Sequence, residues 1–331
     1  MLSAFFIPIS TTNITLEKNN FFNLTFNDAE PLIGLKGPGV ALVGCKSPLT
    51  DAVRNSLRIL HSQFRNIQLY DFGYPKDESP ENINNILTFC GQSGIIPVFI
   101  GENFGTVNDS RNRNDSIIIS NDLKQMTSSS NIIGYQRHLC TLENVFQAEE
   151  FKYNTISLGK MRSNPSILEP ALRHTSELFV HLKALRSSDA SNIISTYPTG
   201  LYAEELCQIL KHAGTGSRIK AVFFEAQLKS DIGNQEAEIV AEAVWYFAEG
   251  INNRVADHPD ISSDYTQFII HSLSLDEDLE FLKHNQTTKW WLKHPFRVTP
   301  PQYLACSYEE YHDTINDDIP DRIFKFINNE S

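Results

Sequence analysis

Short apolar runs alternate with amphipathic stretches along most of the chain. GVALVGC at 39–45 is apolar throughout, as expected of a strand that is buried on both faces of a parallel sheet. In the next stretch Val53, Leu57 and Phe64 recur at helical spacing, so that they share one face of a helix. The alternation continues to residue 254 and predicts an α/β fold, with a mainly parallel sheet of about eight strands and helices on both faces. The predicted strands lie at 39–45, 66–73, 95–101, 116–120, 131–136, 154–160, 177–185 and 219–228.

The pattern changes at both ends of the chain, and we expect three segments. Residues 1–38 are polar and irregular and end in GLKGPG, whose glycines precede a strand and therefore do not form a dinucleotide fingerprint. Residues 39–254 form the α/β domain. Residues 255–331 predict a C-terminal appendage, a hairpin followed by a helix, that packs on the same domain. Trp290 and Trp291 lie in this appendage; strand alternation would bury one and expose the other, so core packing and a partner surface both stay open.

Composition limits the classes of partner. The 331 residues carry a net charge of −12, which disfavours nucleic acid as a main partner. No run approaches the ~18 apolar residues that a membrane span needs, and the N-terminus lacks the features of a signal peptide. The five cysteines are scattered, odd in number and without a CxxC pair, which suits reduced thiols. We expect a cytoplasmic protein without membrane or nucleic-acid partners.

Charged and polar residues follow several of the predicted strands. In a parallel sheet, ligands bind at the carboxyl ends of the strands, so these residues are the candidate site. A protonated lysine has no lone pair to give and repels a cation, so the set is a poor site for two metal ions. The candidates are Glu102, Asn103, Ser120, Asp122, Lys124, His181, Lys183 and Glu225.

The order of these stretches resembles the arginase (ureohydrolase) superfamily, and most closely its formimidoylglutamase-like branch of Bacteroidetes type. The resemblance covers most of the chain and implies a three-layer αβα arginase-like fold. It is carried by IIPVFIGENFG, NIIGYQ, SDASNIISTYPTGLYAEELCQILKHAG, FFEAQL and NQEAEIVAEAVWYFAEGINNR, and in the tail by TTKWWLKHP and CSYEEYHDTINDDIPDR.

The resemblance also implies which positions would hold metal. Active members bind two manganese ions through Gly-Gly-Asp-His, Asp-x-His-x-Asp and Asp-x-Asp motifs. Here these read Ile100-Gly101-Glu102-Asn103, Ser120-Asn121-Asp122-Leu123-Lys124 and His181-Leu182-Lys183. On this alignment no ligand position keeps the family residue. Only Asp122 and His181 could ligate a metal, with Asn103 and Ser120 as weak neutral donors. Glu225 matches the glutamate that helps bind the guanidinium-type substrate.

Two interpretations of the lysines stay open. Lys183 and Lys124 either replace the ions by pairing with Glu102, Asp122 and Glu225, or point into solvent.

Three functional hypotheses follow. The first is a catalytically inactive ureohydrolase-fold protein, a pseudoenzyme without a cofactor, that acts by binding or assembly as a homo-oligomer or with a protein partner. Its cleft would hold a small cationic or zwitterionic ligand through Glu225. The alternative is a manganese-dependent amidino- or formimidino-hydrolase with relocated ligands from Asp122, His181, Glu102 and Asp189. The third is a structural subunit that docks through Trp290 and Trp291.

Overall fold

The centre of the molecule is a nine-stranded sheet in which every neighbouring pair is parallel. All eight predicted strands are present, which confirms the α/β prediction, and a ninth, β2, adds an edge within the segment predicted to be irregular. The computed structural model describes residues 4–9, 24–25, 35–45, 47–102, 104, 115–124, 131–150, 155–229, 234–296 and 300–328. In sheet order the strands are β2 (Leu24–Thr25), β4 (Gln68–Asp71), β3 (Gly39–Gly44), β6 (Ile95–Gly101), β11 (Ala221–Glu225), β10 (Glu177–His181), β7 (Ser116–Ile119), β8 (Asn131–Tyr135) and β9 (Thr155–Ser157).

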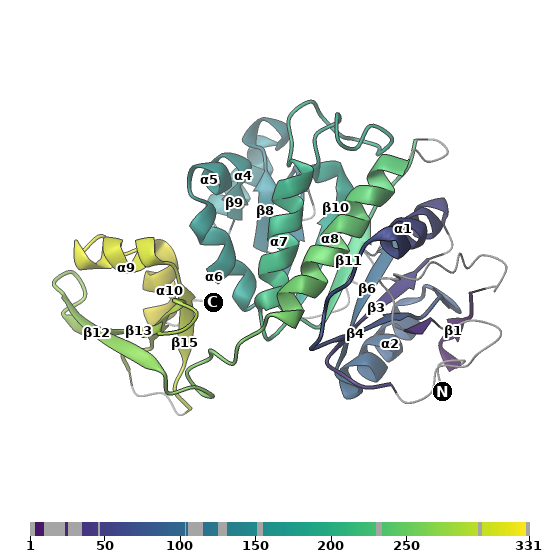
Figure 1. Ribbon diagram of the computed structural model, residues 1–331. Coiled ribbons are helices and arrows are strands. Elements are labelled where there is room, and N and C mark those ends of the chain that lie inside the picture. Colours follow the sequence, from purple (N-terminus) through teal and green to yellow (C-terminus); the bar gives the residue numbers. More distant parts are fainter. Residues whose placement is uncertain are drawn as a thin grey trace.

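Helices cover both faces of this sheet and give three layers, here called the sheet domain (Figure 1). Along β10, Leu178 and Val180 join the core cluster on one face, whereas Phe179 joins the cluster on the other. The first face is covered by α1 (Pro48–Ile59), α5 (Leu158–Ser163), α6 (Leu168–Arg173), α7 (Ala203–Thr215) and α8 (Asn234–Asn252), and the second by α2 (Pro80–Gln92) and α4 (Leu142–Glu150).

The second face carries a stack of aromatic rings across three adjacent strands. The Phe223 ring on β11 lies between Phe99 on β6 and Phe179 on β10, with centroid separations of 4.9 and 4.6 Å and interplanar angles of 7° and 6°. All three side chains are fully buried. Because the stack spans the middle of the sheet, it fixes the relative position of the strands whose carboxyl ends carry the candidate residues.

A buried ion pair holds α1 against β4. Ser47 caps the helix by accepting from the Thr50 backbone N–H, and Arg54, two turns after Ser47, points at the sheet. Arg54 Nε lies 3.0 Å from Asp71 Oδ2, and its Nη2 donates to the Gly73 carbonyl at 2.9 Å. Both charged side chains are almost without solvent contact and compensate each other in the interior, while Arg54 Nη1 also reaches the exposed Asp51 at 2.9 Å.

The appendage is larger than the predicted hairpin and helix. The hairpin is present as β12 (Tyr265–Ser272) and β13 (Glu277–His284), but two further strands extend it into a four-stranded antiparallel sheet, and two helices follow. In Figure 1 this appendage lies beside α6, at the β9 end of the central sheet. The added elements are β14 (Trp290–Lys293), β15 (Tyr303–Cys306), α9 (Tyr308–Ile315) and α10 (Asp321–Ile327); near the N-terminus β1 (Phe6–Ile7) pairs with β5 (Tyr74–Pro75).

Both tryptophans of β14 are buried, so the expectation that one of them is exposed is wrong. Trp290 is 6% exposed and Trp291 is 2% exposed. Trp290 stacks on Tyr311 of α9 at 4.2 Å, whereas Trp291 lies under the Arg173 guanidinium of α6 at 4.6 Å. Alternation does send the two rings to opposite faces, but each face is covered. Neither ring therefore forms an exposed contact surface.

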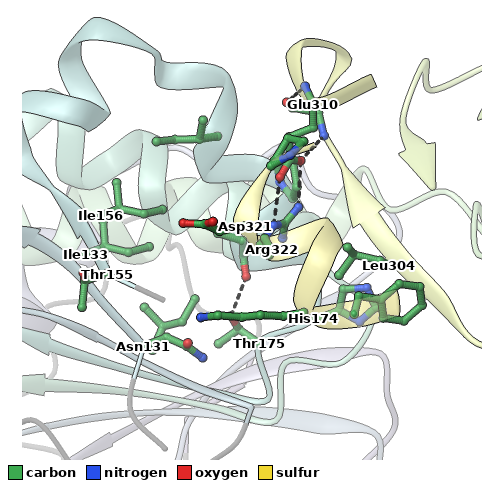
Figure 2. Close-up of a pocket in the computed structure, with 18 of the residues that line it drawn as sticks. Asn131, Ile133, Thr155, Ile156, His174, Thr175, Leu304, Glu310, Asp321 and Arg322 are labelled. Atoms are coloured by element: carbon green, nitrogen blue, oxygen red, sulfur yellow. Dashed lines mark hydrogen bonds and ion pairs between the residues drawn. The ribbon is translucent and has the colours of Figure 1, made fainter. Parts of the chain in front are cut away.

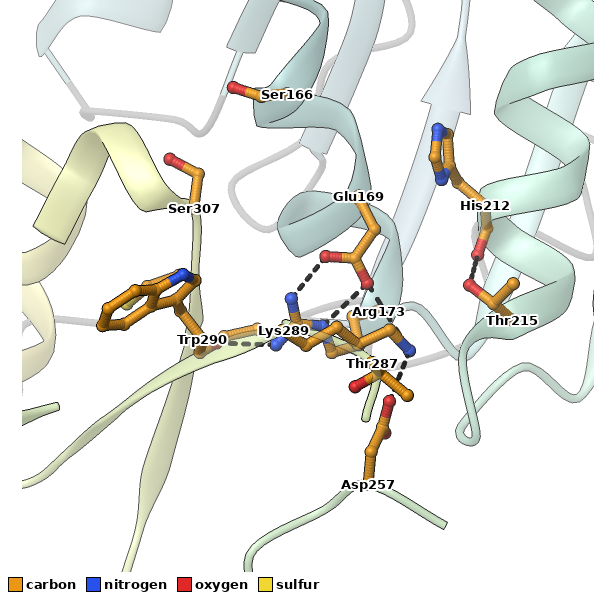
Figure 3. Close-up of polar contacts among 12 residues, drawn as sticks. Ser166, Glu169, Arg173, His212, Thr215, Asp257, Thr287, Lys289, Trp290 and Ser307 are labelled. Atoms are coloured by element: carbon orange, nitrogen blue, oxygen red, sulfur yellow. Dashed lines mark hydrogen bonds and ion pairs between the residues drawn. The ribbon is translucent and has the colours of Figure 1, made fainter. Parts of the chain in front are cut away.

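Polar contacts join α6 to the appendage at the same place (Figure 3). Arg173 Nη1 donates to the Trp290 carbonyl at 2.7 Å, and its Nε donates to Glu169 at 2.9 Å. Lys289, just before β14, lies 2.8 Å from Asp257 and 3.7 Å from Glu169. These charges alternate in sign, so the junction between sheet domain and appendage is an ion network around a buried arginine.

Candidate functional site

The sheet order brings most of the candidate residues to one edge. Strands β6, β11, β10 and β7 are consecutive neighbours, and in their register Glu225 lies opposite both Gly101 and His181. Because the strands are parallel, their carboxyl ends meet on one side. We call this edge the rim. It comprises Glu102, Ser120, Asp122, His181, Lys183 and Glu225. Asn103 lies outside the described residues.

His181 and Glu225 form a buried pair at the centre of the rim. His181 Nδ1 lies 3.4 Å from Glu225 Oε2, and the Phe104 backbone N–H donates to Glu225 Oε1 at 2.8 Å. Burial lowers the pKa of His181 to about 4, and the nearby Lys183 ammonium acts in the same direction. Burial also raises the pKa of Glu225, although the Phe104 N–H partly opposes this. His181 is therefore neutral at pH 7, and its Nε2 has no hydrogen-bond partner among the described residues.

Lys183 points into the rim and pairs with Asp122. Strand β10 ends at His181, earlier than predicted, and a 3₁₀ turn at Leu182–Ala184 redirects the chain. Lys183 Nζ then lies 3.0 Å from Asp122 Oδ2, with side chains 21% and 11% exposed. The other oxygen, Asp122 Oδ1, accepts from the Lys124 backbone N–H at 3.2 Å. Both oxygens of this carboxylate are thus engaged by groups of the chain itself.

The remaining candidates contribute less to the rim. The Lys124 side chain is exposed, so only its backbone takes part. Glu102 is exposed too. Ser120 is buried. Its hydroxyl accepts from the Asp122 backbone N–H at 3.4 Å and donates to Asp122 Oδ1 at 3.5 Å. Asp189, proposed as a relocated ligand, accepts from Arg186 Nε at 2.7 Å and from the backbone at the start of α7.

Sequence reasoning gave little weight to two side chains near the rim. Asn121 donates through Nδ2 to the Lys183 carbonyl at 2.8 Å and so holds the 3₁₀ turn in place. Cys45 follows β3, and burial together with the Glu78 and Glu102 carboxylates raises the pKa of its thiol. The thiol is therefore protonated and a poor nucleophile. Cys45 ends the predicted strand 39–45 and Asn121 follows the predicted strand 116–120, which is the only signal that could have pointed to them.

The residues of the rim do not fit a pair of divalent metal ions. Two such ions need a dense set of carboxylates and imidazoles. In the part of the chain that the structure describes, no three His, Cys, Asp or Glu side chains lie close enough to share an ion. Asp122, which the sequence analysis named as a possible ligand, is already paired with an ammonium group. The positive charge among the rim residues is the Lys183 ammonium group.

A large cavity lies elsewhere, between the sheet domain and the appendage (Figure 2). Its volume is about 1040 Å³, and its lining on the side of the sheet domain extends from Asn131 at the amino end of β8 to Tyr135 at the carboxyl end of that strand. His174, Thr155 and Asn131 line it from the sheet domain, whereas Leu304 and Arg322 line it from the appendage. Burial and surrounding arginines lower the pKa of His174 to about 3. No candidate residue of the rim lines this cavity.

Within the described ranges, none of the helices has both the length and the apolar character that crossing a bilayer requires.

Comparison with known proteins gives matches among solved structures only. No protein-family model and no curated protein matches the chain. Formiminoglutamase from Trypanosoma cruzi with Mn²⁺ matches with a TM-score of 0.55 at 15% identity, over 65% of this chain and 94% of that one. Formimidoylglutamase from Bacillus subtilis matches with a TM-score of 0.56 at 13% identity, over 67% and 90% of the two chains. An arginase superfamily protein from Trypanosoma cruzi matches with a TM-score of 0.54 at 15% identity. These matches confirm the predicted three-layer arginase-like fold, in its formimidoylglutamase-like form.

Proposed function

We propose that this chain is a catalytically inactive member of the ureohydrolase fold, which acts in the cytoplasm by binding or assembly. The observation that carries the proposal is the 3.0 Å ion pair between Lys183 and Asp122. Hydrolysis by the fold's metal-dependent chemistry needs water whose pKa is lowered from ~15.7 to near 7 by a bound ion. In this rim the cation beside Asp122 is the Lys183 ammonium group, which cannot activate water in that way.

Electrostatics gives the size of the effect. A divalent ion bound by Asp122 would lie about 2 Å from the carboxylate oxygen. It would therefore lie no more than about 5 Å from the Lys183 ammonium, which is itself 3.0 Å from that oxygen. At an effective dielectric constant of about 20, a +1 and a +2 charge at that separation repel by about 7 kcal/mol. Metal binding would have to overcome this repulsion or displace the lysine.

Glu225 is also poorly placed to receive a cationic ligand. One of its oxygens accepts the Phe104 N–H and the other faces His181. A guanidinium or ammonium ligand would have to displace one of these contacts, so the proposal rests on assembly and less on small-ligand binding. The cytoplasmic assignment is supported by the five cysteines, all of them free thiols.

The test compares bound metal in three forms of the full chain purified with manganese present. We expect close to no manganese by mass spectrometry, and no hydrolysis of formimidoylglutamate, for the native chain. Lys183→Asp removes the ammonium and adds a carboxylate, whereas Lys183→Met only removes the ammonium. We expect more bound manganese in Lys183→Asp than in Lys183→Met. Nearly two ions per native chain, together with hydrolysis, would overturn the proposal in favour of the manganese-dependent hydrolase with relocated ligands.

A further inference from the structure

Strand β12 forms one edge of the four-stranded sheet in the appendage. In the sheet order β12-β13-β14-β15, β12 pairs with β13 alone. The pairing runs through eight consecutive positions, from Tyr265 opposite His284 to Ser272 opposite Glu277, without a bulge. Figure 1 shows β12 at the outer border of the appendage. An edge of this kind is a ready template for another strand.

Along β12, the backbone N–H and C=O groups point alternately towards β13 and towards the open edge, and one hydrogen bond shows which residues do which. Asn285 N–H donates to the Asp264 carbonyl, one step beyond the first register pair of β12 and β13. Backbone bonds to β13 therefore come from even-numbered residues of this strand, because hydrogen-bonding direction alternates along an antiparallel strand. The N–H and C=O groups of Gln267, Ile269 and His271 point to the opposite side. Among the described residues, no strand lies there to receive them.

The edge lacks the features that usually protect such strands. Natural edges carry lysines, other charges, prolines or bulges. Residues 265–272, YTQFIIHS, contain no Lys, Arg, Asp, Glu or Pro, although the whole chain carries a net charge of −12. Ile269 is 65% exposed, and Leu273, just after the strand, is 79% exposed. A neutral, apolar edge on an acidic protein favours contact with an equally neutral strand.

We propose that two copies of this chain associate through β12, antiparallel and about a twofold axis at Ile269, so that the two appendages form one eight-stranded sheet. This register fits both the alternating direction of the backbone hydrogen bonds along β12 and the alternating faces of its side chains. It pairs odd-numbered residues, whose backbone groups are free, with odd-numbered residues. It also places Phe268 opposite Ile270 of the second copy, on the face where both pack against the appendage core. Tyr265 falls opposite Leu273, and no two like charges meet.

A second copy fits this edge better than an unrelated strand because the strand is complementary to itself. A twofold contact uses the same surface on both partners, and here each apolar residue meets another apolar residue. The proposal goes beyond the proposed function, since it holds whether or not the rim hydrolyses a substrate. A wrong dimer proposal would show as a monomer in the solution mass of the chain. A wrong proposed function would show as bound manganese together with hydrolysis of formimidoylglutamate.

The test measures the solution mass of the full chain by light scattering after gel filtration, across a wide range of concentration. We expect twice the chain mass of 37.5 kDa. Ile269→Lys would place two ammonium groups opposite each other at the axis and should give a monomer with an unchanged circular dichroism spectrum. Leu142→Lys is the matched control, because Leu142 is a similarly exposed apolar residue (73%) on α4, and this variant should stay dimeric.

The register is tested separately by cysteine cross-linking. In a hydrogen-bonded antiparallel pair the Cα atoms lie about 5.5 Å apart, which suits a disulfide. Ile269→Cys should therefore form a disulfide-linked dimer under mild oxidation, whereas Gln267→Cys, on the same edge and face, should not. A native chain that is monomeric at every concentration would overturn the proposal and leave the edge to a strand of another protein. A dimer that persists in Ile269→Lys, with no cross-link at position 269, would place the interface elsewhere.

Discussion

Arg173 joins the sheet domain to the appendage, and its replacement tests how much this junction contributes to stability. Its side chain is only 3% exposed. It donates to the Trp290 carbonyl at 2.7 Å, lies 4.6 Å from the centre of the Trp291 ring and binds Glu169. Arg173→Met keeps a flexible apolar stem of similar length but removes every donor and the charge.

The expected loss follows from these contacts. A buried hydrogen bond from a charged donor contributes about 1.5–3 kcal/mol, and a desolvated cation–π contact about 2 kcal/mol. Glu169 would keep Lys289 at 3.7 Å, which limits the cost of leaving its carboxylate behind. We therefore expect Arg173→Met to lower the free energy of unfolding by about 3–5 kcal/mol, a large part of the 5–15 kcal/mol that is typical of a folded protein.

Arg162 offers a matched control because it makes the same three kinds of contact at the surface. It binds Glu205 at 2.7 Å, donates to the Gly200 carbonyl at 2.8 Å and lies 4.4 Å from the Tyr202 ring centre. Its side chain is 35% exposed, so water can replace much of what is lost. Arg162→Met should cost about 1 kcal/mol or less.

The assay is equilibrium unfolding in urea, followed by circular dichroism and by tryptophan fluorescence. Two of the three tryptophans belong to the appendage, so fluorescence reports mainly on that part of the molecule. We expect both probes to move to lower urea in Arg173→Met and to stay nearly unchanged in Arg162→Met. Equal losses in the two variants would refute the argument that burial decides the size of the effect.

Three further replacements have defined outcomes. Asp71→Asn removes the buried acidic partner of Arg54 and leaves this guanidinium only the exposed Asp51, which should cost about 3–5 kcal/mol in urea unfolding, whereas Arg54→Met with Asp71→Leu should recover much of that loss. Phe223→Ala opens a cavity in the aromatic stack and should lower the free energy of unfolding by about 3–5 kcal/mol in the same assay. His174 has a folded-state pKa of about 3 against an ordinary 6.5, so the unfolded chain binds the extra proton between these values. Stability should therefore fall as pH drops from 6.5 towards 3, by about 1.4 kcal/mol per pH unit from this residue, and His174→Gln should show a correspondingly smaller slope in pH-dependent urea unfolding.

Local periodicity was enough to predict the parallel strands but not the full appendage. Buried runs such as 39–45 and 95–101 are long and apolar, and each has an amphipathic helix beside it in the sequence, after 39–45 and before 95–101, so their pattern is strong. β14 and β15 have four residues each and are separated by a proline-containing stretch, which leaves too short a pattern to recognise. β2, with two residues, has no pattern at all.

Burial of both tryptophans could not be predicted because it depends on segments far apart in the sequence. Alternation along β14 assigns Trp290 and Trp291 to opposite faces of a sheet, and it does so correctly. Whether a face meets water depends on what packs against it. Here Arg173, from a helix more than a hundred residues earlier, covers the second face, and nothing in the local sequence of α6 indicates this role.

The rim was predictable in position but not in its pairing. Strand ends placed Asp122, Lys183 and Glu225 in one region because parallel strands end on the same side. The partner of each depends on the order of strands in the sheet, which the alternation of strands and helices does not specify. β10 lies beside β7, so Lys183 meets Asp122, and β11 lies beside β6, so Glu225 meets Phe104 instead of a lysine.

The position of β11 has a consequence for folding during synthesis. This strand lies in the middle of the sheet between β6 and β10, yet it is the last of the nine to leave the ribosome. Until then the earlier strands can form only two part-sheets, one ending in β6 and the other in β10, each with an apolar open edge. Such long-range closure is slow, and open edges favour aggregation. A nascent chain stopped before Ala221 therefore lacks the strand that joins its two halves, and this stage of synthesis is where a chaperone would matter most.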